Sequence, residues 1–290
     1  MGAVLDRINE FIKEALLGWV KSNLGGMFGD VNTKVGTIAA EVGRTPSSWN
    51  GSAFSMVRGL SDTVVLPIAG MVIAFVLCHE LISMVMDRNN MHDFDTWLFF
   101  KYIFKAGVAV MLLGRTSDIV MGIFDIGSHL VSEAAGFTAA STYLDVEDTL
   151  EAMLDAGIAS MGIGELLGLG VESMLASLGM KIMSVLITIV LYGRMIEAYL
   201  YISVAPVPFA TLGNRDLSGI GANYIKGVAA LAFQGFFIMV CVAIYAALVQ
   251  NVSVSGNIHS ALWQSMAYTA LLCFALLRTG TLAKNILHAS

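Results

Sequence analysis

Residues 191–208 read LYGRMIEAYLYISVAPVP, and this stretch decides how the rest of the chain can fold. It ends a long apolar run in which Arg194 and Glu197 lie three residues apart. Charges in such a run are costly in lipid unless they pair internally or face water. Pro206 and Pro208 then end the predicted helix, because proline lacks the backbone N–H that a helix needs. We therefore expect this segment near the centre of the protein's architecture and function.

The spacing of side chains within this segment predicts an internal pair. Residues three apart share one helix face, so Arg194 and Glu197 can pair there, with Tyr201 one turn beyond Glu197. Tyr192 and Tyr199, two turns apart, form a separate stripe beside that face. The pair would let the helix bend at the prolines without an unpaired charge in lipid. The alternative is that the same pair lines a water-filled path.

The amino-acid composition indicates a membrane protein. Of the 290 residues, 57% are hydrophobic and 13% are charged, and the mean hydropathy is +0.75. A soluble domain carries about 25% charged residues. The net charge of −6 argues against a nucleic-acid-binding surface, although not against a nucleic acid passing through a pore.

Apolar segments of about 20 residues recur along the chain. At about 1.5 Å per residue, each covers a hydrocarbon core roughly 30 Å thick. We predict an all-α membrane protein with about five transmembrane helices, N-terminal amphipathic helices and an acidic helical extracytoplasmic insert. The predicted spans are 64–86, 97–114, 180–204, 228–249 and 261–277.

Ionisable residues occur near the ends of the first two spans. His79 and Glu80 lie towards the far end of the first, and intramembrane ionisable residues are functional candidates. At that depth they can instead reach headgroups or cap a neighbouring segment. Lys101 and Lys105, one turn apart near the start of the second span, can extend their ammonium groups to the near interface.

The first 60 residues are more polar than the spans. Residues 1–24 alternate apolar and charged positions at helical spacing, which predicts an amphipathic helix that Gly25-Gly26 ends. Such a helix lies in the membrane interface or packs on its own protein. A weaker amphipathic segment covers 27–42. In the turn-rich stretch that follows, Trp49 is either an interfacial anchor or a side chain that fills the hinge.

Residues 116–176 contain ten Asp and Glu residues and no Lys or Arg. Within this insert, the sequence of residues 153–176 predicts a re-entrant or surface-lying hairpin. Gly164 and Gly168 are spaced for close contact between helices. These features divide the chain into an N-terminal amphipathic region, two spans, an acidic insert, and three spans with the C-terminus. The predicted boundaries are 1–61, 62–114, 115–176 and 177–290.

Charge placement suggests an orientation. The acidic insert lacks basic residues, which cluster around the opposite helix ends, so the positive-inside rule places the insert outside and the C-terminus in the cytoplasm. Five spans then place the N-terminus outside. Arg115 and Lys181, which flank the insert, and the six basic residues among the first 60 oppose this orientation.

No catalytic pattern stands out. The five histidines lie on separate segments without metal-ligand spacing, and Cys78, Cys241 and Cys273 lie far apart in apolar runs. There is no nucleophile elbow or phosphate-binding loop, and the acidic insert lacks the spacing of a calcium loop. We therefore expect no catalytic, cofactor or metal site, and a protein that is not an enzyme.

Long stretches of the chain resemble a known family. They are LCHELISMVMDRNNMHDFDTWLFFKYIFK (77–105), YGRMIEAYLYISVAPVPFATLGNRD (192–216), AFQGFFIMVCVAIYAALVQ (232–250) and the final residues from 268. They resemble the TrbL-type polytopic membrane subunit of type IV secretion (conjugation) systems. More narrowly, the chain is similar to the conjugation proteins of Gram-positive integrative elements. Only the insert after about residue 130 looks unlike the family.

The resemblance implies a channel or scaffold component of the cytoplasmic membrane that helps a DNA–protein substrate across. It also implies a homo-oligomer in membrane lipid. The implied partners are coupling and traffic ATPases, single-span assembly subunits, and, transiently, translocating single-stranded DNA or relaxase. The alternative is a secondary transporter or small-ion channel with Arg194, Glu197, His79 and Glu80 at a midplane site. Transporters often contain inverted repeats, and none is found here.

Overall fold

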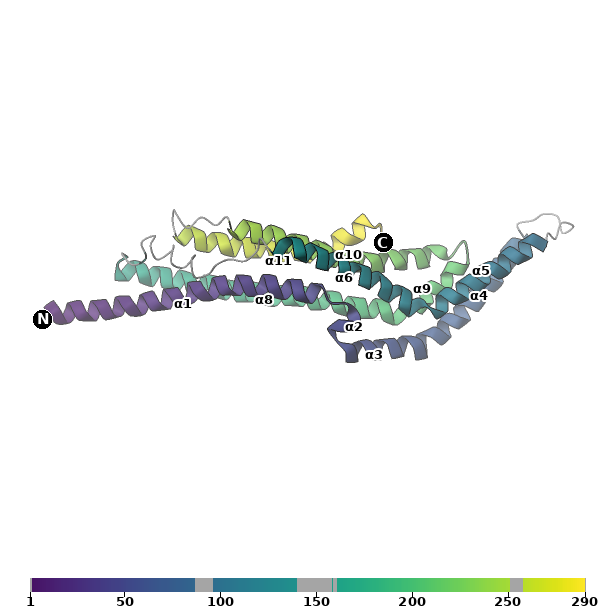
Figure 1. Ribbon diagram of the computed structural model, residues 1–290, viewed down its shortest axis with the longest axis horizontal. Coiled ribbons are helices and arrows are strands. Elements are labelled where there is room, and N and C mark those ends of the chain that lie inside the picture. Colours follow the sequence, from purple (N-terminus) through teal and green to yellow (C-terminus); the bar gives the residue numbers. More distant parts are fainter. Residues whose placement is uncertain (1, 87–95, 140–157, 159–160, 251–257, 290) are drawn as a thin grey trace. The chain divides into compact units, whose positions relative to one another are not determined.

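The computed structural model describes residues 2–86, 96–139, 158, 161–250 and 258–289 (Figure 1). Throughout these residues the fold is helical and contains no strand. A π-helical turn, η1 (Ser61–Val65), joins α3 to α4, and a 3₁₀ turn, η3 (Thr211–Gly213), follows α9. The helices are α1 (Gly2–Val42), α2 (Pro46–Trp49), α3 (Gly51–Leu60), α4 (Leu66–Met86), α5 (Thr96–Gly114), α6 (Thr116–Ala139), α8 (Ile163–Val204), α9 (Pro206–Ala210), α10 (Ser218–Gln250) and α11 (Ile258–Ile286).

Four helical stretches within the described residues are long and apolar enough to cross a membrane. A fifth span results if α5 and α6, which are bent by 66° at their junction, count as one. The predicted all-α membrane protein with about five spans is thus confirmed. The four stretches are Gly51–Met86, Ile163–Val204, Ser218–Gln250 and Ile258–Ile286.

The third span is longer than predicted. Because α8 runs without a break from Ile163 to Val204, residues 163–176 are a continuous extension of the span. The predicted hairpin over 153–176 is therefore wrong for this part, and residues 153–157 lie outside the described residues. Glu165 does not interrupt the helix because its carboxylate accepts a hydrogen bond from the Gly162 N–H (3.0 Å), as a helix N-terminus favours.

The first span is also extended, upstream of Pro67. There the backbone N–H of Leu66 bonds the carbonyl of Ser61, five residues earlier. Pro67 has no N–H and its ring crowds the carbonyl four residues before it, so a wider turn at this point relieves the conflict. The π-helical turn therefore allows α3 and α4 to form one stretch across the proline.

The helix α1 passes straight through Gly25-Gly26, so the predicted stop at these glycines is wrong. One face stays buried on both sides of the pair, with Val20, Leu24 and Met27 at most 1% exposed. Each glycine costs about 1 kcal/mol of helix propensity relative to alanine. Burial of a continuous apolar face outweighs that cost, because tertiary packing supplies most helical stability in proteins.

The chain forms two compact units, each gathered from three separate parts of the sequence. Unit 1 comprises Met1–Val42, Val131–Leu191 and Ile238–Arg278. Unit 2 comprises Gly43–Leu130, Tyr192–Phe237 and Thr279–Ser290. The boundaries predicted from the sequence, which follow chain order, stay a prediction.

In unit 1, α1 lies along α8, and the two helices run in the same direction. Trp19 packs on Gly170, Asn23 Nδ2 donates to Ser173 Oγ (3.1 Å), and Lys34 Nζ donates to the Met180 carbonyl (3.0 Å). Burial lowers the pKa of Lys34, and the charge of Asp30 partly opposes that shift. Of the two placements open to the N-terminal helix, the structure shows packing on its own protein.

A close approach of α1 to α8 depends on the absence of a side chain at position 170. A Cβ added to Gly170 would lie 2.3 Å from the Trp19 ring, whereas one added to Gly168 or Gly164 would meet nothing within 4 Å. The glycine that brings helices together is therefore Gly170, and the predicted contact through Gly164 and Gly168 is wrong.

We expect Gly170→Val to destabilise unit 1 by about 1–3 kcal/mol, because an overpacked core forces side chains and backbone to shift. Thermal unfolding of the purified protein in detergent measures the loss. The matched control is Gly168→Val on the same helix, which introduces the same side chain into open space. Equal melting temperatures for the two variants would contradict the packing described here.

Candidate functional site

After the end of α8, residues 205–213 form a bend in unit 2, which we call the proline elbow. As predicted, α8 ends at Val204, and Pro206 begins α9 as its first residue. The hydroxyl of Thr211 donates to the carbonyl of Pro208 (2.7 Å) and accepts from the backbone N–H of Gly221 (3.1 Å). Thr211 therefore joins the elbow to the first turn of α10.

Tyr199 attaches α8 to the short helix α2. Its hydroxyl lies 2.9 Å from the carbonyl of Pro46 and 3.1 Å from that of Asn50. The ring of Trp49 packs between Tyr192 and Tyr199, with centroid distances of 5.3 and 5.9 Å. Trp49 was predicted to be either an interfacial anchor or a side chain that fills the hinge. Its packing on Tyr192 and Tyr199 supports the second role.

Tyr201 faces α10, on the other side of α8. Its ring lies 5.6 Å from that of Tyr224, and the Tyr224 hydroxyl donates to the Tyr201 carbonyl (2.8 Å). Gly227 allows this contact, because a Cβ there would lie 2.9 Å from the Tyr201 ring. The tyrosines at 199 and 201 therefore hold the end of α8 between two neighbouring segments.

The charges of α8 take partners from other helices. Glu197 Oε1 accepts from Lys284 Nζ on α11 at 2.7 Å, and each of these side chains is more than a third exposed. Arg194, 7% exposed, donates from Nε to the Leu231 carbonyl on α10 (3.2 Å). The partner of Glu197 is thus a lysine 87 residues later in the chain, in place of the predicted pair with Arg194.

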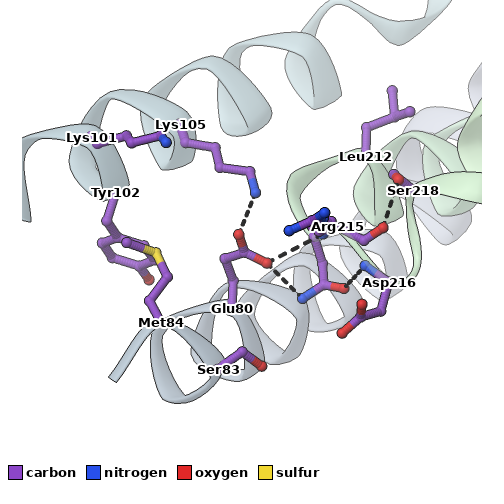
Figure 2. Close-up of a pocket in the computed structure, with 11 residues that line it drawn as sticks. Glu80, Ser83, Met84, Lys101, Tyr102, Lys105, Leu212, Arg215, Asp216 and Ser218 are labelled. Atoms are coloured by element: carbon purple, nitrogen blue, oxygen red, sulfur yellow. Dashed lines mark hydrogen bonds and ion pairs between the residues drawn. The ribbon is translucent and has the colours of Figure 1, made fainter. Parts of the chain in front are cut away.

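Glu80 forms a second charge cluster in unit 2, between α4, α5 and the loop after η3 (Figure 2). Its Oε1 is bonded to Lys105 Nζ, while Oε2 accepts from Asn214 Nδ2 (2.8 Å) and the backbone N–H of Arg215 (3.2 Å). Glu80 is 8% exposed as a residue, and both of its carboxylate oxygens accept hydrogen bonds. Glu80 was predicted either to act as a functional intramembrane group or to reach headgroups or cap a neighbouring segment. Its hydrogen bonds to the loop after η3 fit the cap.

Asn214 is the residue of this cluster that the sequence reasoning missed. It is 1% exposed, and its Oδ1 accepts from the backbone N–H groups of Asp216 (2.8 Å) and Leu217 (3.0 Å). Its Nδ2 also lies 3.2 Å from His79 Nδ1. Asparagine just before a helix is a capping signal, so its position before α10 could have marked it.

A polar pocket of about 780 Å³ opens beside Glu80. The pocket brings together predicted residues Glu80, Lys101 and Lys105, while Arg194, Glu197 and the prolines lie elsewhere in unit 2. No group of three potential metal ligands occurs among the described residues. The lining residues are Glu80, Ser83, Met84, Lys101, Tyr102, Lys105, Leu212, Asn214, Arg215, Asp216 and Ser218.

Comparison with known proteins identifies the family. Residues 31–206 match the family described as TrbL/VirB6 plasmid conjugal transfer like protein. No curated protein and no solved structure matches the chain. The matched range includes Glu80, Lys105 and Glu197 but ends before Asn214 and Lys284, the partners of two of them. Since the match extends over more than half of the residues, this chain belongs to the TrbL/VirB6 family of plasmid conjugal transfer proteins.

Proposed function

We propose that this chain is a channel and scaffold subunit in the cytoplasmic membrane of a conjugative type IV secretion system. Its family and its apolar helices make it a multi-pass membrane component of a conjugal transfer system. The proposal adds that it helps a DNA–protein substrate cross the cytoplasmic membrane. It acts without catalytic chemistry or a cofactor.

The observation that carries the proposal is the separation of charged and apolar side chains in unit 2. Two ion pairs, Glu197–Lys284 and Glu80–Lys105, join neighbouring helices in unit 2. Large apolar side chains point outward on the same helices, including Phe104 on α5, which is 75% exposed. Such outer faces fit lipid or neighbouring copies of the chain, and inward ionisable groups mark polar paths in membrane proteins.

The distribution of basic residues suggests how the protein is oriented in the membrane. We place the part of the acidic insert between α6 and α8, together with the N-terminus, outside, and the C-terminus in the cytoplasm, following the distribution of basic residues. The subunit forms a homo-oligomer beside single-span assembly subunits. Coupling and traffic ATPases dock from the cytoplasm, and relaxase-bound single-stranded DNA contacts the path transiently.

The test is to delete the gene and to cross-link substrate DNA to the complemented protein during mating. We expect conjugation to fall to background on deletion, and transferred-strand DNA to be recovered with this chain only when the relaxase is present. Normal conjugation without the gene would overturn the proposal. Solute flux through the purified protein alone in liposomes, without DNA cross-linking, would favour a transporter or small-ion channel instead.

The pair of Glu197 and Lys284 provides a sharper prediction. Because both side chains are more than a third exposed, their attraction contributes only about 0–1 kcal/mol to stability. Glu197→Gln is therefore expected to keep the membrane abundance of the protein near the wild-type level while lowering conjugation frequency, if the pair lines the path.

The control for this prediction is the exchanged pair, Glu197→Lys with Lys284→Glu, which restores the ion pair with reversed polarity. Quantitative immunoblotting of membranes measures abundance, and mating assays measure transfer. A collapse of abundance in Glu197→Gln that the exchange repairs would make the pair structural, and the pore-lining role would be wrong. Normal abundance with normal transfer would exclude both roles.

A further inference from the structure

Two basic side chains at the pocket beside Glu80 are not compensated by a carboxylate within the described residues. Lys105 compensates Glu80, whereas the side chains of Lys101 and Arg215 form no ion pair within the part of the chain that the structure describes. Figure 2 shows Lys101, Lys105 and Arg215 along one side of the pocket, with the Asp216 carboxylate on the opposite side. Lys101 and Arg215 therefore supply two positive charges against the single Asp216 carboxylate, so this part of the pocket suits an anion.

The pocket lies beside the start of α5, which carries exposed aromatic side chains. Trp97 is 73% exposed, and Phe99 and Phe100 are also exposed, all within the first two turns of α5. Tryptophan in particular concentrates at the level of lipid headgroups. Lys101 follows Trp97 by about one turn, so its long side chain can extend to the same membrane interface, where lipid phosphates are found.

From these observations we propose that the pocket binds the phosphate of an anionic phospholipid headgroup. Arginine offers a planar set of donors that matches phosphate, and lysine adds a point charge. Lys101 and Arg215 supply the charge, and Ser83 and Ser218 also line the pocket. A volume of about 780 Å³ accommodates a headgroup. The inference requires membrane placement alone and does not depend on the channel role.

A lipid fits the site better than a nucleic-acid strand does. The helices that contribute Glu80 and Lys105 also expose large apolar side chains, such as Met86 (75%) and Phe104 (75%), so the pocket is bordered by faces suited to acyl chains. Single-strand binding grooves combine continuous positive charge with stacking platforms. Here the basic residues are confined to one pocket, and the whole chain has a net charge of −6.

The experiment uses the purified full-length protein in detergent, with thermal unfolding as the readout. Phosphatidylglycerol, phosphatidylcholine, inorganic phosphate and a single-stranded oligonucleotide are titrated separately. We expect phosphatidylglycerol to raise the melting temperature and the other three to leave it unchanged. Lys101→Gln with Arg215→Gln is expected to weaken the apparent affinity for phosphatidylglycerol by about thirtyfold. Lys105 stays in place, because its removal would leave Glu80 without its cation.

Two further variants make the result specific. Lys226→Gln removes an exposed charge on α10 outside the pocket and is expected to keep wild-type affinity. Lys101→Arg preserves the charge and is expected to retain most of the affinity. Equal stabilisation by phosphatidylcholine, undiminished affinity in the double variant, or an equal loss in Lys226→Gln would overturn the proposal. Stabilisation by inorganic phosphate or by the oligonucleotide alone would also overturn it, in favour of a free anion or a nucleic acid.

Discussion

Glu80→Ala is expected to destabilise unit 2 by about 1.5–3 kcal/mol, the usual contribution of hydrogen bonds to a charged group, because the Asn214 amide is buried and loses its acceptor. The substitution removes the acceptor of the Asn214 amide and of the Arg215 N–H, and it leaves Lys105 without its carboxylate. Because the loop between η3 and α10 loses its contact with α4, the start of α10 should loosen as well. Membrane abundance and the melting temperature in detergent measure the effect.

Two variants show whether the effect comes from this particular site. Glu80→Gln keeps an oxygen that can accept from Asn214 and is expected to lie between wild type and Glu80→Ala. Asp62→Ala removes an exposed carboxylate upstream on the same spanning stretch, where its partner Arg58 lies 3.8 Å away. Exposed pairs contribute about 0–1 kcal/mol, so this control should melt close to wild type. If Glu80→Ala melted with it, Glu80 would not hold the loop.

Gly221→Val is expected to cost about 3 kcal/mol, at the upper end of the usual range for overpacking. A Cβ at this position would lie 2.6 Å from the Pro208 carbonyl oxygen and 2.6 Å from the Leu212 side chain. The carbonyl cannot retreat easily, since it belongs to α9 and accepts from the Thr211 hydroxyl. The elbow would therefore have to separate from α10.

The matched control is Gly219→Val, two residues earlier, where a Cβ would meet nothing within 4 Å. The two variants are directly comparable because both positions lie in the first turn of α10 and receive the same side chain. Thermal unfolding and conjugation frequency are measured for both. Similar losses in the two variants would point to helix propensity and would argue against the close contact with Pro208.

Features that depend on local sequence were predictable here. Long apolar runs predict spanning helices because a bilayer leaves few other ways to satisfy backbone hydrogen bonds, and Pro206 ends α8 because of its own covalent structure. Two of the wrong predictions, the helix end at Gly25-Gly26 and the hairpin over residues 163–176, have one cause. In both places, packing against distant helices decides whether a weak local signal ends the helix.

The partners of the charged residues could not be predicted in the same way. Helical spacing brings Arg194 and Glu197 onto one face, yet Glu197 binds Lys284, and Glu80 binds Lys105 and Asn214. These contacts join residues 25 to 134 positions apart. Periodicity within one helix does not show which neighbouring helix packs against it. The charged candidate residues were therefore predictable, but their partners were not.

The pairing of Glu197 with Lys284 also has a consequence for biosynthesis. The two residues are separated by 87 positions, and chains grow at about 5–20 residues per second. Glu197 thus leaves the ribosome roughly 4–17 s before its partner does. During that interval its carboxylate lacks the lysine that compensates it in the folded state. We therefore expect the insertion machinery to shelter α8, to keep it in contact with water, or to hold it with Glu197 protonated, until α11 has been made.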